Sequence, residues 1–297
     1  MTTILAEGPP SGGVAATSRP PNRLAEKITG RTYLSYSQVN LMRSCPRKFA
    51  FLYVEKTSPD FIPSSLIFGG SIHSSLELYF RAKLEGLEVT KEALLSAYHD
   101  AWKRQQEQAR EQTGADDNVR FNKGDDVDTL HVLADRMLTV FLQSSFAQPK
   151  GVILGVEEQL RVVVDPGLPD LMAKVDLVTH TDGCLHVVDF KTSRSRWTAE
   201  KAQESGDQLV LYAVTVETMS RSLELPVKLH FAIITKAKTP VVQLLPVQVD
   251  GGRVEMLKEI VASVWQAIQS GNFYPSPSPM NCTTCPFRSR CPVFSRS

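Results

Sequence analysis

Two aspartates in a predicted β-hairpin have the residue type and spacing best suited to chemistry. The apolar runs 171–178 and 184–191 flank Asp182-Gly183, and Asp-Gly between apolar runs is the strongest short signal for a two-residue hairpin loop. With that loop, the register places Asp176 directly opposite Asp189, whereas a longer loop would break the alignment. The two carboxylates are therefore expected to face each other.

Lys191 completes this group, because side chains alternate along a strand and Lys191 stands two residues after Asp189. Two opposed carboxylates repel each other, so either one of them takes up a proton or a cation lies between them. Oxygen ligands suit Mg²⁺ or Mn²⁺, and Mg²⁺ is usually held by one or two carboxylates together with phosphate oxygens. The pattern points to phosphoryl chemistry, and its alternative is an ordinary surface hairpin with a solvated ion pair.

The composition limits the class of protein. The 297 residues, 42% apolar and 22% charged, are enough for one elaborated domain. With 33 Lys and Arg against 32 Asp and Glu, the net charge is +1, so any binding to nucleic acid must use local basic patches. The apolar runs are too short to span a membrane and the first residues lack the features of a signal peptide, which predicts a cytoplasmic protein.

The hairpin is expected to lie inside an α/β domain. Residues 1–30 are rich in Pro, Gly, Ala, Ser and Thr and are predicted to form a disordered tail, whereas residues 31–297 form the domain. Hydrophobic periodicity predicts a helical part over about 67–147 and a catalytic sheet core over about 152–250. A proline-flanked segment that carries cysteines, 271–297, ends the chain.

Four of the five cysteines form a candidate metal site. Cys282, Cys285 and Cys291 crowd the end of the chain, Cys45 stands at a predicted helix break near the other end, and Cys184 is expected to be a small core residue. In a reducing compartment, four thiolates suit a [4Fe-4S] cluster or tetrahedral Zn²⁺ rather than disulfides. One early and three late cysteines favour the cluster, with Zn²⁺ or no metal as alternatives. Either metal would clasp the two ends of the chain together.

Four motifs follow one another in a fixed order: Gly69-Gly70-Ser71-Ile72-His73, Val175-Asp176-Leu177-Val178, Val188-Asp189-Phe190-Lys191-Thr192 and Gln208-Leu209-Val210-Leu211-Tyr212. Each is weak alone, but the ordered set with the cysteines resembles the RecB-like branch of the PD-(D/E)XK nuclease superfamily in its iron-sulfur form. Relatives include CRISPR adaptation nucleases, AddB-type repair subunits and phage exonucleases. The resemblance covers about residues 35–297 and implies a central mixed sheet flanked by helices. It departs at Ala173, where the family commonly has Gly.

The resemblance implies roles for the motif residues. Asp176 and Asp189 would ligate a catalytic Mg²⁺ or Mn²⁺, with the imidazole of His73 and the backbone carbonyl of Phe190 as further ligands. Lys191 would hold or help to deprotonate the attacking water and offset the charge that grows on the phosphate.

Four other residues are expected near this site. Gln208 and Tyr212 share one face of a helix predicted over about 199–219 and would hold the hairpin or the DNA backbone near the metal, although core packing is an alternative for Tyr212. Glu157 or Glu158 would contact the ligands, or would face solvent.

Basic residues near two of the motifs are candidates for DNA binding, and one aromatic residue is a candidate for base stacking. Each run is otherwise a solvated face. These residues are Arg43, Arg47, Lys48, Arg194, Arg196 and Trp197.

The sequence therefore predicts a metal-dependent DNA exonuclease that acts on single-stranded DNA or DNA ends in recombination, repair or DNA degradation. Some related enzymes also cut single strands internally, and a helicase or recombination protein is an expected partner. One alternative is a catalytically idle DNA-binding or assembly subunit of a helicase–nuclease or recombination complex. The other is a zinc-stapled RNA-processing enzyme.

Overall fold

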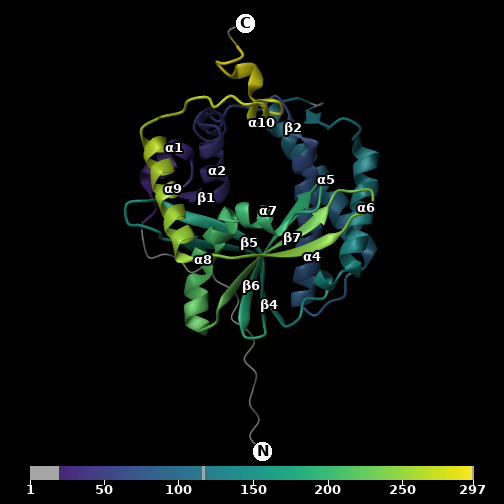
Figure 1. Ribbon diagram of the computed structural model, residues 1–297. Helices are drawn as coiled ribbons and strands as arrows, with labels where there is room; N and C mark the ends of the chain where they lie inside the picture. The colour runs from purple at the N-terminus through teal and green to yellow at the C-terminus, as the bar shows by residue number, and fades with distance from the viewer. Residues whose placement is uncertain (1–19, 116–117, 296–297) are drawn as a thin grey trace, which may run out of the picture.

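The fold is described by a computed structural model for residues 20–115 and 118–295. One mixed sheet occupies its centre, and helices pack on both faces (Figure 1). Its strands are β1 (Tyr33–Ser35), β4 (Val152–Val162), β5 (Asp170–Thr181), β6 (Cys184–Ser193), β7 (Val227–Thr235) and β8 (Val242–Val247). Two further short strands, β2 (Ile62–Pro63) and β3 (Val119–Arg120), pair with each other outside this sheet.

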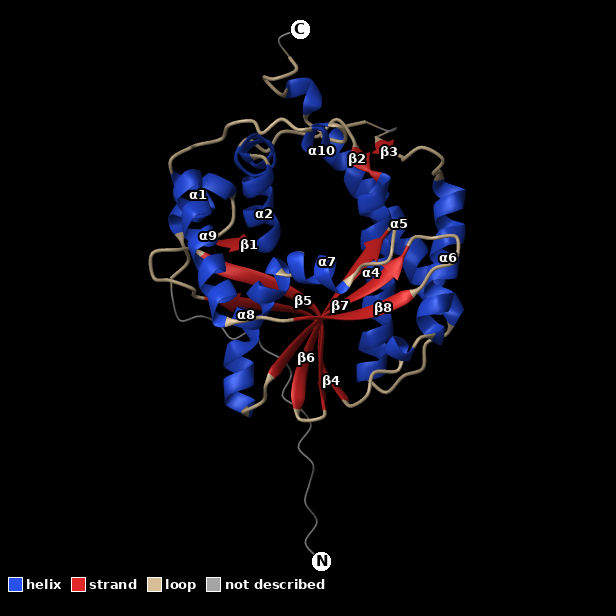
Figure 2. Ribbon diagram, in the orientation of Figure 1, coloured by secondary structure: helices blue, strands red, loops and turns tan. Residues whose placement is uncertain are grey.

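The helices surround the sheet as Figure 2 shows. The long helices α4 (Ser64–Leu84), α5 (Lys91–Thr113) and α6 (Val127–Gln143) cover one face through a cluster that includes Ile72, Phe80 and Phe190. On the other face, α8 (Asp207–Leu223) packs on Val187 and Phe231, and α9 (Gly251–Gln269) packs beside it. The shorter helices are α1 (Arg23–Thr29), α2 (Tyr36–Ser44), α3 (Pro46–Phe49), α7 (Ala199–Glu204) and α10 (Pro279–Cys282).

The predicted hairpin is confirmed. Asp182 and Gly183 have φ angles of 50° and 67°, the left-handed conformation of a two-residue loop, and Thr181 pairs with Cys184 across it. The antiparallel ladder runs in the predicted register but stops at Leu177, which pairs with Val188. Asp176 and Asp189 come next in this register.

The sheet forks at that point. Along one edge of β5, the partner is β6 from Leu177 to Thr181 and then β1, which pairs in parallel with Asp170 to Met172. On β6, residues 184–188 pair with β5, whereas β7 lies along the other edge and pairs with residues 185–193, Asp189 included. On this edge of β5, Asp176 therefore lies between the segment that pairs with β6 and the segment that pairs with β1, and it belongs to neither.

Two predicted boundaries need correction. Residues 1–19 of the predicted tail lie outside the described residues, but α1 forms within it, and its Ala25 is fully buried against the α2–α9 layer. The helix predicted over 199–219 is divided into α7 and α8 at Gly206. A Cβ on Gly206 would lie 2.7 Å from Cγ1 of Val247, so this glycine lets the chain approach β8 closely while it changes direction.

The C-terminal segment returns to the N-terminal helices (Figure 1, yellow). The side chain of Asn281 donates to the backbone carbonyl of Ser44 at 2.8 Å, and the ring of Phe287 stacks on Phe51 with centroids 5.4 Å apart. Phe287 is only 2% exposed. Side-chain packing thus joins the two ends of the described chain. No helix among the described residues is long and apolar enough to cross a membrane.

Candidate active site

Asp176 and the backbone of β6 are joined at the fork of the sheet. Oδ2 of Asp176 accepts a hydrogen bond of 2.6 Å from the backbone N–H of Phe190. This bond takes the place of the ladder where β5 and β6 separate, and it holds the Asp176 carboxylate in a buried position, 6% exposed. The fork therefore turns a strand residue into a fixed carboxylate at the edge of a cavity.

Asp189 is the start of a second set of contacts, which reaches α8. Its Oδ1 accepts from the hydroxyl of Tyr212 at 3.2 Å, and its Oδ2 lies 2.6 Å from Nζ of Lys191. Nζ of Lys191 also donates to Oε1 of Gln208 at 2.8 Å, and Nε2 of Gln208 donates to the Tyr212 hydroxyl at 2.5 Å. Tyr212 thus packs in the core and also donates to the carboxylate of Asp189, while its functional role stays a prediction.

The four residues of this network are Asp189, Lys191, Gln208 and Tyr212, and the network fixes the lysine. Gln208 lies in the first turn of α8 because the chain breaks at Gly206, and one turn later Tyr212 reaches the same carboxylate. The ammonium group is held by an acid and an amide while its side chain remains 32% exposed to the cavity. Such a cation is positioned to meet an anionic substrate.

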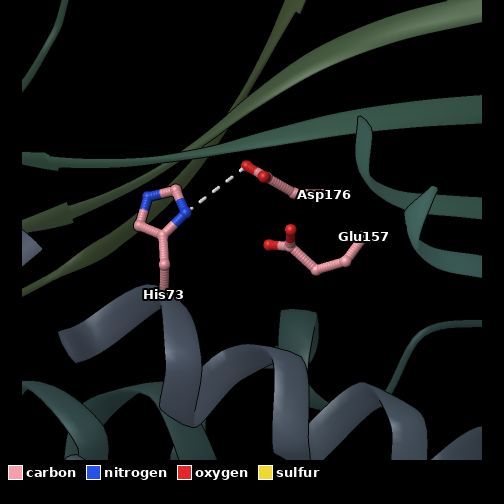
Figure 3. Close-up of side chains that lie close together, drawn as sticks. All are labelled: His73, Glu157 and Asp176. Atoms are coloured by element: carbon pink, nitrogen blue, oxygen red, sulfur yellow. Dashed lines mark ion pairs between the residues drawn. The ribbon is translucent and has the colours of Figure 1, made fainter. Parts of the chain in front are cut away.

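His73, Glu157 and Asp176 form a group whose ligand atoms all lie within 4.8 Å of one another. They come from α4, β4 and β5, and their side chains point toward a common centre (Figure 3). Nδ1 of His73 is 3.7 Å from Oδ2 of Asp176. One imidazole and two carboxylates are a donor set that suits Mn²⁺ or Mg²⁺.

Glu157 has an unusual backbone conformation that aims its side chain into this group. Its φ is 57°, in the left-handed region that costs a residue with a Cβ on the order of 1 kcal/mol. Val156 and Glu158 on either side of it pair with Leu177 and Val175 of β5, so the ladder continues around it. The side chain of Glu157 is 6% exposed and forms an ion pair with Lys174. Glu157 rather than Glu158 is thus the acid at the site.

Burial and neighbouring charges shift the pKa values of the ionisable groups in the site. Burial raises the pKa of Asp189, and the nearby charge of Asp176 raises it further despite Lys191. Burial also raises the pKa of Glu157. Burial acts to lower the pKa of His73, but its contact with Asp176 outweighs that effect and the pKa is raised. A cation beside these groups would favour the charged form of both carboxyl groups.

The chemistry of the donor set tests whether a divalent metal fits here. Two carboxylates and one imidazole nitrogen, from Glu157, Asp176 and His73, converge from three different elements to within 4.8 Å of one another. Hard oxygen ligands with one imidazole suit Mg²⁺ or Mn²⁺. The residues present fit a divalent ion.

The group lines a cavity of about 690 Å³. His73, Glu157, Asp176, Lys191 and Gln208 all contribute to its wall, and so do Gly69 and Gly70 one turn before His73. Phe190 lies behind the wall, 1% exposed, with its ring 5.9 Å from the His73 ring. The ligand role of its carbonyl stays a prediction.

The predicted DNA-binding residues occupy different environments. Arg43 forms an ion pair with Asp207 at 3.0 Å, and Arg47 forms a two-pronged pair with Glu55 while it lies over the ring of Phe51. These pairs compete with phosphate for both guanidinium groups. The other members lie elsewhere: Lys48 beside the cysteines, Arg194 and Arg196 exposed after β6, and Trp197 packed edge-on against Phe231.

Four of the cysteines share one surface. Cys45, Cys282, Cys285 and Cys291 are free thiols, and all four line one narrow cavity of about 20 Å³. No three thiols among the described residues have sulfur atoms that all lie within 4.8 Å of one another. Cys184 is buried in the sheet, 8% exposed, which confirms its prediction as a core residue.

The fold and the acid–lysine site define an α/β protein with a candidate divalent-metal centre. The model of the PD-(D/E)XK nuclease superfamily matches residues 33–292, so the chain belongs to this superfamily. That match covers the fork, the network and the cysteine segment together.

Two solved structures are similar to this chain at low identity, and one of them supports a shared fold. A crystal structure of a candidate exonuclease from Eubacterium rectale is 12% identical, with a TM-score of 0.51 over 90% of this chain and 91% of that one. The structure of a protein called SSO0001 is 14% identical over 79% of this chain and 87% of that one, and its TM-score of 0.35 carries no argument. No curated protein matches the sequence.

Among the residues of the candidate site, only the choice between Glu157 and Glu158 could not be made from the sequence. A strand pattern allows one of two adjacent acids to face inward, and the left-handed φ that selects Glu157 has no local signal such as Gly or Asn. The sequence signal that could have pointed to Glu157 is the pair of adjacent acids in an apolar run, which is expected to form a strand beside the hairpin.

Proposed function

We propose that the chain is a metal-dependent DNA exonuclease that acts on single-stranded DNA or DNA ends. The observation that carries this proposal is the joint placement of His73, Glu157 and Asp176 around one point, with the ammonium of Lys191 held on the same cavity. Superfamily membership supports nuclease chemistry. Recombination, repair or DNA degradation, alone or beside a helicase partner, is the proposed setting.

His73, Glu157, Asp176 and Asp189 would hold the metal. When bound, Mg²⁺ or Mn²⁺ polarises the phosphate and lowers the pKa of bound water. Asp176 is oriented by the Phe190 N–H, which binds the same Oδ2 that lies 3.7 Å from Nδ1 of His73. Ligation would require a neutral imidazole, so a bound cation would act against the raised pKa of His73.

Lys191 acts on the substrate side of the site. Its Nζ is oriented by Asp189 and Gln208, and this geometry suits an ammonium that contacts the attacking water and a non-bridging phosphate oxygen. Tyr212 holds Asp189 from the core side and keeps that carboxylate from rotating away. The intact acids and lysine argue against the idle DNA-binding subunit.

A [4Fe-4S] cluster on Cys45, Cys282, Cys285 and Cys291 is the proposed second cofactor. Zn²⁺ bonded to four thiolates at about 2.3 Å brings sulfur atoms within about 4 Å of one another. The preference for a cluster rests on the cysteine pattern of one early and three late residues, because the four ligands of a cluster bind four different irons.

Cleavage of end-labelled DNA tests the enzymatic proposal. Single- and double-stranded oligonucleotides are incubated with Mg²⁺ or Mn²⁺ and either the wild-type protein or Lys191→Ala. Lys238→Ala, an exposed lysine after β7, is the matched control. Single-nucleotide products from one end, lost in Lys191→Ala and kept in Lys238→Ala, are expected. No cleavage by the wild-type protein would contradict the proposal.

The cluster has its own test. Protein purified without oxygen should absorb near 400 nm if it holds an iron–sulfur cluster, whereas Zn²⁺ gives a colourless protein. Colourless protein that contains one equivalent of zinc would support the alternative metal.

A further inference from the structure

A second cavity, of about 490 Å³, adjoins the active-site cavity. Ser65, in the first turn of α4, lines both cavities. The polar wall of the second cavity is formed by Ser64, Asn122, Lys123, Asp125, Arg194 and Lys236. None of the groups described above as metal ligands lines it, so it is a separate place for a ligand.

The N-terminus of α4 opens onto this cavity. The helix has 21 residues and begins after Pro63, and no side chain caps it. The first backbone N–H groups of a helix have no partner within the helix, and together with the helix dipole they attract an anion.

Ser64 is a second, independent feature that points to a ligand. Its side chain is fully buried, 0% exposed, and its Oγ has no hydrogen-bond partner among the described residues. A buried hydroxyl without a partner is costly unless a bound group satisfies it. Because Ser64 is the first residue of α4 and lines the cavity, one anion can contact both its hydroxyl and the helix N-terminus.

The charge of the wall has the matching sign. Lys123, Arg194 and Lys236 outnumber Asp125, whose Oδ2 already accepts from Asn122 at 3.0 Å. Burial lowers the pKa of Lys236, and the charge of Arg194 lowers it further. The two cations therefore repel each other across the cavity, and an anion between them would relieve the repulsion.

The second cavity stands in a fixed relation to the active site. Arg194 follows Lys191 by three residues at the end of β6. Lys236 follows the end of β7, and its backbone N–H donates to the carbonyl of Ser193 at 2.6 Å. Both basic residues are thus anchored to the strand ends that lead out of the catalytic site.

We propose that this cavity binds a phosphate group of the DNA strand, next to but distinct from the phosphate that is cut. Ser64, the N-terminus of α4, Arg194 and Lys236 would hold that phosphate, and Lys123 would approach it from the loop after β3. The subsite rests on the proposed nuclease function for its substrate. It would fix the position of the strand relative to Lys191 and His73.

The test measures DNA binding without cleavage. Fluorescence anisotropy of a labelled single-stranded oligonucleotide in EDTA compares the wild-type protein with Arg194→Gln/Lys236→Met. Methionine keeps most of the length of the Lys236 side chain but removes its charge, and with it the cation–π contact of Nζ with the Phe68 ring, whose centroid is 5.3 Å away. Lys238→Met, in the same loop but outside the cavity wall, is the control. Thermal melting of all proteins verifies that each is folded.

The double variant should raise the Kd about tenfold and reduce the slope of log K against log salt by about two, one for each lost phosphate contact. In cleavage reactions, KM should rise more than kcat falls. A Kd and a salt slope equal to those of Lys238→Met would overturn the subsite. Binding lost as expected in a protein that does not cleave would sink the nuclease proposal and leave the subsite standing.

Two oligonucleotides distinguish the source of the phosphate. If a terminal phosphate occupies the cavity, a 5′-phosphorylated strand binds the wild-type protein more tightly than a 5′-hydroxyl strand, and the double variant loses this preference. If an internal phosphate occupies it, the double variant weakens both strands equally. If the double variant binds each strand with the same Kd as the wild-type protein, a phosphate subsite of either kind is contradicted.

Discussion

Oδ2 of Asp176 accepts a 2.6 Å hydrogen bond from the backbone N–H of Phe190, across the point where two strands of the sheet separate. The same carboxylate lies within 4.8 Å of the ligand atoms of His73 and Glu157. Asp176 thus accepts a structural hydrogen bond and, in the proposed metal site, would also be a ligand, and two substitutions can separate these tasks.

Asp176→Asn should abolish cleavage and keep the fold. The amide oxygen can still accept from Phe190, but the negative charge is lost, so cleavage of end-labelled DNA should fall at least about 100-fold. Asp176→Ala should also lower the free energy of unfolding by about 1 to 3 kcal/mol, because it leaves a buried N–H without an acceptor. Cleavage assays and denaturant unfolding measure the two effects.

Asp182→Asn is the matched control for this pair. Asp182 lies at the tip of the same hairpin with a φ of 50°, a conformation that Asn also adopts readily. Wild-type cleavage by Asp182→Asn is expected. Normal cleavage by Asp176→Asn would remove Asp176 from the metal site.

Glu157→Gln should weaken metal binding. It removes one charge from the group of three ligands, so the Mn²⁺ concentration for half-maximal cleavage should rise roughly 10- to 100-fold. Glu158→Gln, the neighbouring acid, should leave that concentration close to the wild-type value. If the two variants behave alike, the left-handed conformation of Glu157 does not serve the metal.

The hairpin could be predicted because its signals are local, whereas the fork could not. Asp182 and Gly183 define the loop, and period-two alternation then places Asp189 and Lys191 on one face. The separation of β5 from β6 depends on β1, whose residues come from a distant part of the sequence. Its strand of three residues carries no pattern that names its partner.

The break before Gln208 also has a tertiary cause. Residues 199–219 have continuous helical periodicity, and Ser205-Gly206 interrupts it because β8 packs against the chain there. α1 was missed for a similar reason. It is seven residues long, capped by Asn22, and stabilised by burial against α2 and α9 rather than by its own propensity.

His230 should make the protein less stable in mild acid. Nε2 of His230 lies 3.1 Å from Nδ1 of His186, and burial followed by the charges of His186 and Lys228 lowers the pKa of His230 to about 4. The unfolded chain takes up this proton near pH 6.5 and the folded chain only near pH 4, so stability falls as the pH drops through this window. The ring is partly exposed, which limits the loss to about 1 to 2 kcal/mol.

Denaturant unfolding at pH 7 and pH 4.5 measures this loss. His230→Gln should reduce the difference in unfolding free energy between the two pH values, since all other titrating groups are common to both proteins. An unchanged difference would show that the histidine pair does not govern the acid response.

Phe287 should anchor the C-terminal segment whether or not a metal is bound. Its ring is 2% exposed and stacks on Phe51, so Phe287→Ala should cost about 3 kcal/mol and expose the end of the chain to proteases. Met280→Ala, at a side chain that is 91% exposed, should change neither property. Melting and limited proteolysis provide the measurements.

Cys285→Ser separates the metal from this packing. If the segment is held by Phe287 and by the Asn281 bond to Ser44, Cys285→Ser should lose the absorbance near 400 nm yet resist proteolysis better than Phe287→Ala. The variant that is cleaved faster by protease shows whether the cluster or the aromatic contact holds the segment. Should Cys285→Ser be cleaved as fast as Phe287→Ala, the cluster rather than the aromatic contact would hold the ends together.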